Sequence, residues 1–104
     1  MLDFKRRKGE VKTMDFEKVK GRIFKENENG DTLAEITYKY VGEDIALATH
    51  TFVDPSLRGG GVAEELVDAL VTEMEVQGKK IKPVCPYVVM LFKRKPDKYG
   101  HIEA

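Results

Sequence analysis

Apolar and polar residues alternate with a period of two in the first half of the chain, which predicts β-strands there. Over residues 32–41 one face carries only apolar or aromatic side chains, those of Ala34, Ile36, Tyr38 and Tyr40. This alternation is typical of a half-buried strand. Residues 45–53 contain almost no charge, as in a central strand buried on both faces. Over residues 16–24, apolar and charged residues alternate less regularly. The Asn29-Gly30 pair predicts a hairpin turn after this segment.

After residue 60 the spacing of apolar residues changes to three and four, which predicts an amphipathic helix that ends at Gly78. Its apolar side consists of Val62, Ala63, Leu66, Val67, Leu70 and Met74. Residues 80–85 predict a short strand, and a strand-helix-strand unit of this length implies a right-handed crossover with parallel strands. Pro86 suits the start of a second helix, and Pro96 suits its end.

These elements predict a mixed α/β fold of the α+β type. We expect three antiparallel strands, a crossover helix, a fourth strand parallel to the third, and a C-terminal helix. With 104 residues, of which 41% are hydrophobic, the chain suits one domain, which we place at residues 16–104. Residues 1–15 are rich in lysine and arginine and are expected to form a flexible basic tail. A nucleic-acid-binding arm is the sharper alternative for this tail, but short charged runs are usually only solvated.

Composition excludes several classes of function. The formal net charge is zero, so no overall field favours nucleic acid or membrane partners. The chain has a single cysteine, Cys85, and no cluster with metal-ligand spacing, so we expect neither an internal disulfide nor a metal site. No segment is long and apolar enough for a membrane span or a signal peptide. We therefore expect an intracellular, cytoplasmic protein.

The segment that carries the candidate chemistry is a glycine-rich loop between the predicted central strand and the first helix. The start of a helix leaves backbone N–H groups unpaired and carries a partial positive charge, so it suits a phosphate group. Glycines allow the backbone to approach such a ligand closely, and Arg58 adds a cation. Taken alone, a glycine run is more often a flexible connector. No Gly-Lys-Ser/Thr follows these glycines, so the loop is not a P-loop.

The spacing Arg58-x-x-Gly61-x-Ala63, preceded by Val53-Asp54-Pro55, resembles the acetyl-CoA motif of the GCN5-related N-acetyltransferases (GNAT). The order of segments from residue 17 to residue 99 is similar to that of the small, single-domain subfamily typified by human N-acetyltransferase domain-containing protein 1. The resemblance implies a minimal GNAT-like fold that binds acetyl-CoA or coenzyme A, with the pantetheine arm between strands that end at Val53 and Cys85. It implies a cofactor-binding set of Phe52, Val53, Arg58, Gly59, Gly60, Gly61, Val62 and Ala63.

Two residues are candidates for catalysis beside the thioester. His50 lies near the end of the predicted central strand, on the face of Ala48 and Phe52 if alternation continues, and an imidazole there could accept the proton of an amine. The alternative is a structural histidine bonded to a neighbour. Cys85 directly precedes a helix start, which would lower the pKa of its thiol. It could protonate the CoA thiolate, accept the acetyl group, or only fill space in the core.

The function we predict is acetyl transfer from acetyl-CoA to an amine of unknown identity, on a protein or a small molecule. Two alternatives from other classes stay open. One is a CoA-binding or regulatory module with little turnover. The other is a protein-interaction domain whose glycine loop is only a connector, which predicts no affinity for CoA.

Overall fold

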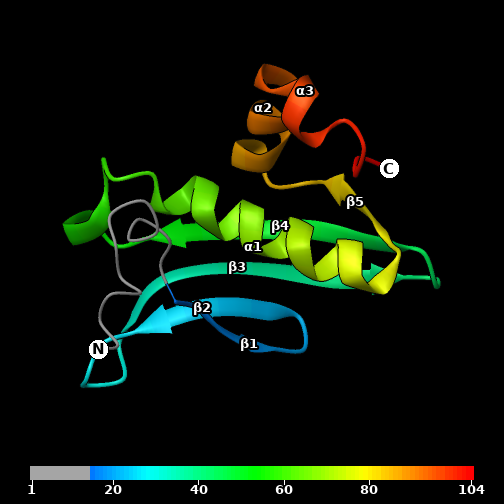
Figure 1. The fold of residues 1–104 in the computed structure, drawn as a ribbon. Coiled ribbons are helices and arrows are strands. Elements are labelled where there is room, and N and C mark those ends of the chain that lie inside the picture. Colours follow the sequence, from blue (N-terminus) through cyan, green and yellow to red (C-terminus); the bar gives the residue numbers. More distant parts are fainter. Residues whose placement is uncertain (1–14) are drawn as a thin grey trace, which may run out of the picture.

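The computed structural model describes residues 15–104, and Figure 1 shows their arrangement. The basic tail expected over residues 1–15 lies outside the described residues, apart from Asp15. The elements in chain order are β1 (Glu17–Val19), β2 (Arg22–Glu26), β3 (Thr32–Val41), β4 (Ile45–Val53), a 3-10 turn (Pro55–Leu57), α1 (Val62–Gln77), β5 (Lys80–Pro83), α2 (Pro86–Arg94) and α3 (Pro96–Tyr99).

The strands form one sheet in the order β1-β2-β3-β4-β5. The first four strands are antiparallel, and β5 pairs with β4 in parallel after the crossover through α1. The mixed α/β prediction is confirmed, with two additions. The sheet has five strands rather than four, because the three residues of β1 turn back onto β2 and are too few to give a periodic signal. Pro96 ends α2 but also begins the four-residue α3.

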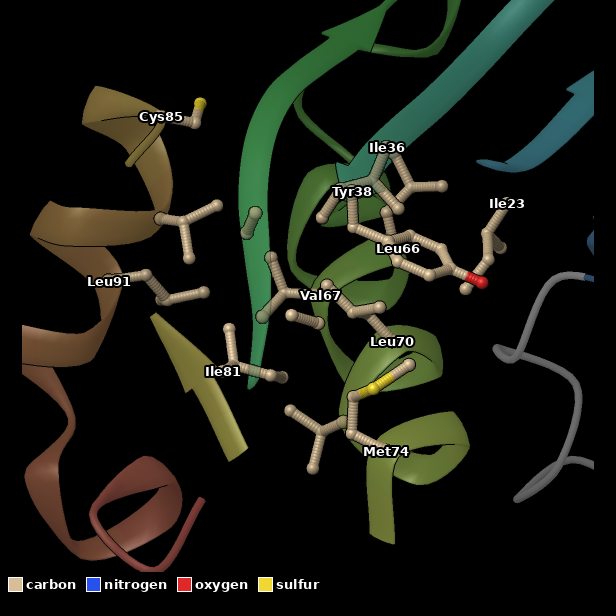
Figure 2. Close-up of a cluster of buried hydrophobic side chains, with 14 of the residues drawn as sticks. Ile23, Ile36, Tyr38, Leu66, Val67, Leu70, Met74, Ile81, Cys85 and Leu91 are labelled. Atoms are coloured by element: carbon tan, nitrogen blue, oxygen red, sulfur yellow. The ribbon is translucent and has the colours of Figure 1, made fainter. Parts of the chain in front are cut away.

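The hydrophobic core lies between the sheet and α1 (Figures 1 and 2). Helix α1 points its apolar side at the sheet, as the spacing of three and four predicts, and Leu66, Leu70 and Met74 are fully buried there. The sheet contributes Ile23, Ile36, Tyr38 and Ile81 to the same cluster. Val88, Leu91 and Phe92 of helix α2 also belong to this buried cluster.

A β-bulge in β4 decides which way its last residues point. Thr37 pairs with His50 but the next residue of β3, Tyr38, pairs with Ala48, so Thr49 is an extra residue in β4. Because residues directly opposite each other share a face, Ala48 lies on the α1 face with Tyr38, whereas His50 lies on the other face with Thr37. The expected grouping of His50 with Ala48 is therefore wrong.

The two faces of β4 are buried to different extents, which corrects the prediction of burial on both. Ala46 and Ala48 are fully buried against α1. On the opposite face, Thr49 and His50 are exposed, and no helix among residues 15–104 covers them (Figure 1). The low charge of this strand therefore reflects one buried face and a second face of threonine, histidine and half-exposed apolar side chains.

The last residues of the described chain pack against the rest of the fold rather than fraying. Ile102 is 4% exposed, and the backbone groups of Ile102 and Ala104 bond to Ile81 of β5. His101 also forms a 2.7 Å contact from Nε2 to Oε2 of Glu75. No helix within residues 15–104 has both the length and the apolar character that crossing a membrane requires.

Candidate functional site

The loop from β4 to α1 is held in a fixed shape by its own side chains. Asp54 accepts hydrogen bonds from the backbone N–H and the hydroxyl of Ser56, at 2.9 and 2.6 Å, which start the 3-10 turn and lower the pKa of its carboxyl. Arg58 donates from Nε to the carbonyl oxygen of Val53 at 3.0 Å. This contact fixes the guanidinium group beside the end of β4.

The glycines of this loop shape the backbone directly before α1. Gly59 and Gly61 have φ angles of +89° and +81°, which side-chain-bearing residues rarely adopt. Gly61 is the N-cap of α1, no side chain within the described residues caps it, and a Cβ placed on it would meet no heavy atom within 4 Å. Among the described residues, no capping side chain therefore occupies the N–H groups of the first helical turn, as an anion site requires.

Strands β4 and β5 separate beside this loop. Their pairing runs from Ile45 opposite Lys80 to Ala48 opposite Pro83. The backbone N–H groups of Val84 and Cys85 both donate to the carbonyl oxygen of Ala48, at 3.0 and 2.9 Å, and the chain then turns into α2. Beyond Ala48, the edge of β4 that faces this divergence has no strand partner among the described residues.

Cys85 lies at the divergence, as the N-cap of α2 and 7% exposed (Figure 2). Its Sγ is 3.5 Å from Oγ1 of Thr51, which lies on the α1 face of β4 opposite Ile36. Burial raises the pKa of this thiol, but hydrogen bonds with the Thr51 hydroxyl and from the N–H groups of Val88 and Tyr87 outweigh burial, so the pKa lies below its usual value. The lowered pKa agrees with the helix-start expectation.

Sequence reasoning missed Thr51, whose contact with Cys85 predicts a measurable effect on the thiol. We expect Thr51→Val to raise the pKa of Cys85, because valine keeps the shape of threonine but cannot donate a hydrogen bond to the thiolate. The rate of alkylation of Cys85 against pH should then show a midpoint at higher pH than in the wild type. Thr51→Ser is the control that should keep the low midpoint. Equal midpoints in the wild type and Thr51→Val would show that the hydroxyl does not influence the thiol.

The structure does not bring His50 and Cys85 together on one face. His50 is exposed on the face of β4 opposite α1, whereas Cys85 reaches Thr51 on the α1 face. The two residues nevertheless lie on the same stretch of the sheet, because His50 is the direct neighbour of Thr51. Phe52 lies on the face of His50 and Val53 on the face of Thr51, both partly buried, at the end of β4.

A polar cluster that the sequence did not reveal joins the first turns of α1 to α3. It consists of Glu64 and Asp68 from α1, Lys95 directly before α3, and Lys98 and Tyr99 from α3. The Tyr99 hydroxyl is 2.6 Å from Oδ1 of Asp68 and 3.1 Å from Oε2 of Glu64. No sequence motif marks this cluster, because its members are brought together only when α3 packs beside α1.

Comparison with known proteins identifies the family of this domain. The family model of the GCN5-related N-acetyl-transferases matches residues 22–102. The solution structure of a GCN5-like candidate N-acetyltransferase from Staphylococcus aureus superposes with a TM-score of 0.73 and 25% sequence identity, over 88% of this chain and 89% of that one. A search of curated proteins finds no match.

Two larger structures share the fold. A candidate acetyltransferase from Deinococcus radiodurans has a TM-score of 0.54 and 20% identity, over 70% of this chain and 51% of that one. The ribosomal-protein-alanine N-acetyltransferase of Brucella melitensis has the same TM-score and identity, over 80% of this chain and 59% of its own. The family model covers most of the strands and helices described above, including the glycine loop, the β4–β5 divergence and Cys85. The chain belongs to the GCN5-related N-acetyltransferase family, whose members use acetyl-CoA.

Proposed function

We propose that this protein binds acetyl-CoA at the β4–β5 divergence and transfers the acetyl group to an amine. One observation carries the proposal. The edge of β4 that has no strand partner among residues 15–104 runs between the start of α1 and the buried thiol of Cys85. An anion site, a strand edge that can bond amide groups, and a reactive thiol therefore line one path, which matches the order of groups in acetyl-CoA.

The phosphate end of this path is the start of α1. The N–H groups of Val62 and Ala63 and the partial positive charge of the helix would bind the pyrophosphate. Gly59, Gly60 and Gly61 would let the phosphate oxygens approach the backbone. Arg58, fixed by its bond to Val53, would add a charge-assisted hydrogen bond.

The middle of the path is the edge of β4 between Thr49 and Val53. Its backbone N–H and C=O groups could bond the amides of the pantetheine arm, as an added strand bonds to the edge of a sheet. Phe52 and Val53 would contact the arm from the two faces of the strand. The arm would deliver the thioester toward Thr51 and Cys85.

The thioester end suits covalent transfer through Cys85. A thiol whose pKa is lowered by hydrogen bonds has a larger thiolate fraction at neutral pH. The thiolate would attack the acetyl carbonyl carbon, forming a new C–S bond to Cys85 while the C–S bond to CoA breaks and the CoA thiolate leaves. The amine would then attack the same carbonyl carbon, forming the C–N bond of the amide while the C–S bond to Cys85 breaks and the Cys85 thiolate is released. The amine proton passes to solvent in this step, because His50, the base that the sequence predicts, lies on the face of β4 opposite the one that Cys85 reaches.

Arg58→Ala should weaken acetyl-CoA binding about tenfold at low salt, the scale of one charge-assisted hydrogen bond. The difference from the wild type should shrink as salt is raised, because salt screens the exposed guanidinium group. Calorimetric titrations at two salt concentrations measure both quantities. Arg58→Gln is the control for lost charge with a retained polar side chain. A loss that does not depend on salt would mean that Arg58 only holds the loop through Val53.

One observation favours the alternative of a CoA-binding module with little turnover. The face of β4 that carries His50 is not enclosed by any helix of the described residues, so an acceptor amine there would be open to water. Incubation with acetyl-CoA and a mixture of amines separates the two functions. The proposed transferase forms acetylated amine in proportion to enzyme concentration and time. With a binding module, free CoA appears from acetyl-CoA no faster than it does in buffer without protein.

A further inference from the structure

The first turn of α1 contains an acidic residue, Glu64, at a position where an unpaired carboxylate would oppose phosphate binding. Glu64 is the third residue of α1, in the same turn whose N–H groups form the proposed anion site. Its carboxylate is held by Lys95, at 3.0 and 3.1 Å, and by Lys98, at 2.7 Å. Lys98 also contacts Asp68 at 3.2 Å. Two carboxylates and two ammonium groups thus balance each other beside the glycine loop.

The environment of Glu64 keeps its charge fixed. Hydrogen bonding from Lys98, aided by Lys95 and Tyr99, lowers the pKa of Glu64 to about 2, so the carboxylate is ionised throughout the neutral range. Tyr99 is 1% exposed and its ring stacks on Phe92 with centroids 4.9 Å apart. Burial and the two nearby carboxylates raise the pKa of Tyr99, so its hydroxyl remains a neutral donor.

The same residue therefore has two opposed effects. Its contacts with Lys95, Lys98 and Tyr99 attach the α2–α3 segment to α1, which stabilises the fold. Its charge offsets both the partial positive charge of the helix start and that of the two lysines, which weakens the field that attracts an anion.

We propose that Glu64 limits the affinity of this site for CoA, holding two lysines in a neutral cluster where they would otherwise strengthen the binding of its phosphates. This inference rests on the proposed function, since it concerns the same helix start. It makes Glu64 a residue that sets affinity without being part of the phosphate contacts. Weaker binding of this kind favours release of CoA after acetyl transfer.

The test is a calorimetric titration of CoA into the wild type and Glu64→Gln at low salt. Glutamine keeps the size of the side chain and leaves the cluster with one positive charge in excess. We expect CoA to bind about three- to tenfold tighter to Glu64→Gln, the scale of one added charge near a protein surface. The melting temperature should fall at the same time, because contacts with Lys95 and Lys98 are weakened.

Asp68→Asn is the matched control. It makes the same change of charge and also weakens a bond to Tyr99, but it lies one helical turn, about 6 Å, further from the loop. Its gain in affinity should be clearly smaller than that of Glu64→Gln. Lys95→Met changes the charge in the opposite direction and should weaken CoA binding, which tests the inference even if Glu64→Gln does not fold.

The outcomes are distinct. If the wild type binds CoA but folded Glu64→Gln binds it no more tightly, or if Lys95→Met binds it as well as the wild type, the inference is overturned while the proposed function stands. If the wild type does not bind CoA, the proposed function fails and the inference fails with it. If Glu64→Gln and Asp68→Asn increase the affinity for CoA equally, the charge effect does not act at the helix start as the inference requires.

Discussion

Gly61→Asp should abolish acetyl-CoA binding, weakening it by about a hundredfold or more, while the chain stays folded. The substitution places a carboxylate at the N-cap of α1, where the pyrophosphate is proposed to lie, and its charge would repel the phosphates. The new Cβ meets no heavy atom of the surrounding described residues within 4 Å, so it causes no steric clash there. The left-handed backbone at φ +81° costs about 1–2 kcal/mol for a residue with a side chain, which a stable domain tolerates.

Gly61→Asn is the control that isolates charge from backbone strain. Asparagine has nearly the same shape as aspartate, and both residues tolerate the left-handed conformation better than other side chains do. We expect a much smaller loss of affinity than for Gly61→Asp, with similar melting temperatures for the two variants. If Gly61→Asp binds acetyl-CoA like the wild type, the glycine loop is not the phosphate site.

Cys85→Ala should reduce acetyl transfer by about a hundredfold or more, the scale of a lost nucleophile, with little change in CoA affinity. Before the acceptor is added, the wild type incubated with acetyl-CoA should gain the mass of one acetyl group, which hydroxylamine removes from a thioester. Cys85→Ala should show no such gain. The small cavity left by alanine should cost about 1 kcal/mol of stability, so loss of folding does not explain the result.

The same experiment distinguishes the other roles of the thiol. A general acid gives no adduct, yet Cys85→Ala slows transfer while CoA affinity holds. A cysteine that only fills the core gives no adduct, and its replacement leaves transfer unchanged. Cys85→Ser is a further control, since a hydroxyl keeps the size and polarity of the side chain but is a far weaker nucleophile at neutral pH.

The loop, the helix that follows it and the parallel crossover could be predicted from the sequence because their signals are local. The spacing of apolar residues in α1 and the glycines before it each reflect neighbours within one element. The near absence of charge in β4 predicts a strand, but not that only one of its faces is buried. The structure confirms the spacing, because Leu66, Val67, Leu70 and Met74 of the predicted apolar side are all fully buried. The family resemblance then gave the position of the candidate site.

Other features depend on register and packing between distant segments, which a pattern along one strand does not contain. The bulge at Thr49 moves His50 to the face opposite Ala48, although strict alternation places both on one face. The contact of Thr51 with Cys85 joins residues 34 positions apart. The partners of Glu64 are 31 to 35 positions away, so its balanced charge could not be predicted.

An amide NMR titration of the 104-residue protein with acetyl-CoA tests the central claim most directly. We predict the largest shifts at three places: the backbone N–H groups of Gly59 to Ala63, those of Thr49 to Val53 along the edge of β4 beside the divergence, and those of Cys85, Tyr87 and Val88 at the start of α2. Residues of β1 and of the C-terminal turn of α1 should change little. Absence of binding, or shifts confined to segments away from the β4–β5 divergence, would contradict the proposed acetyl-CoA site.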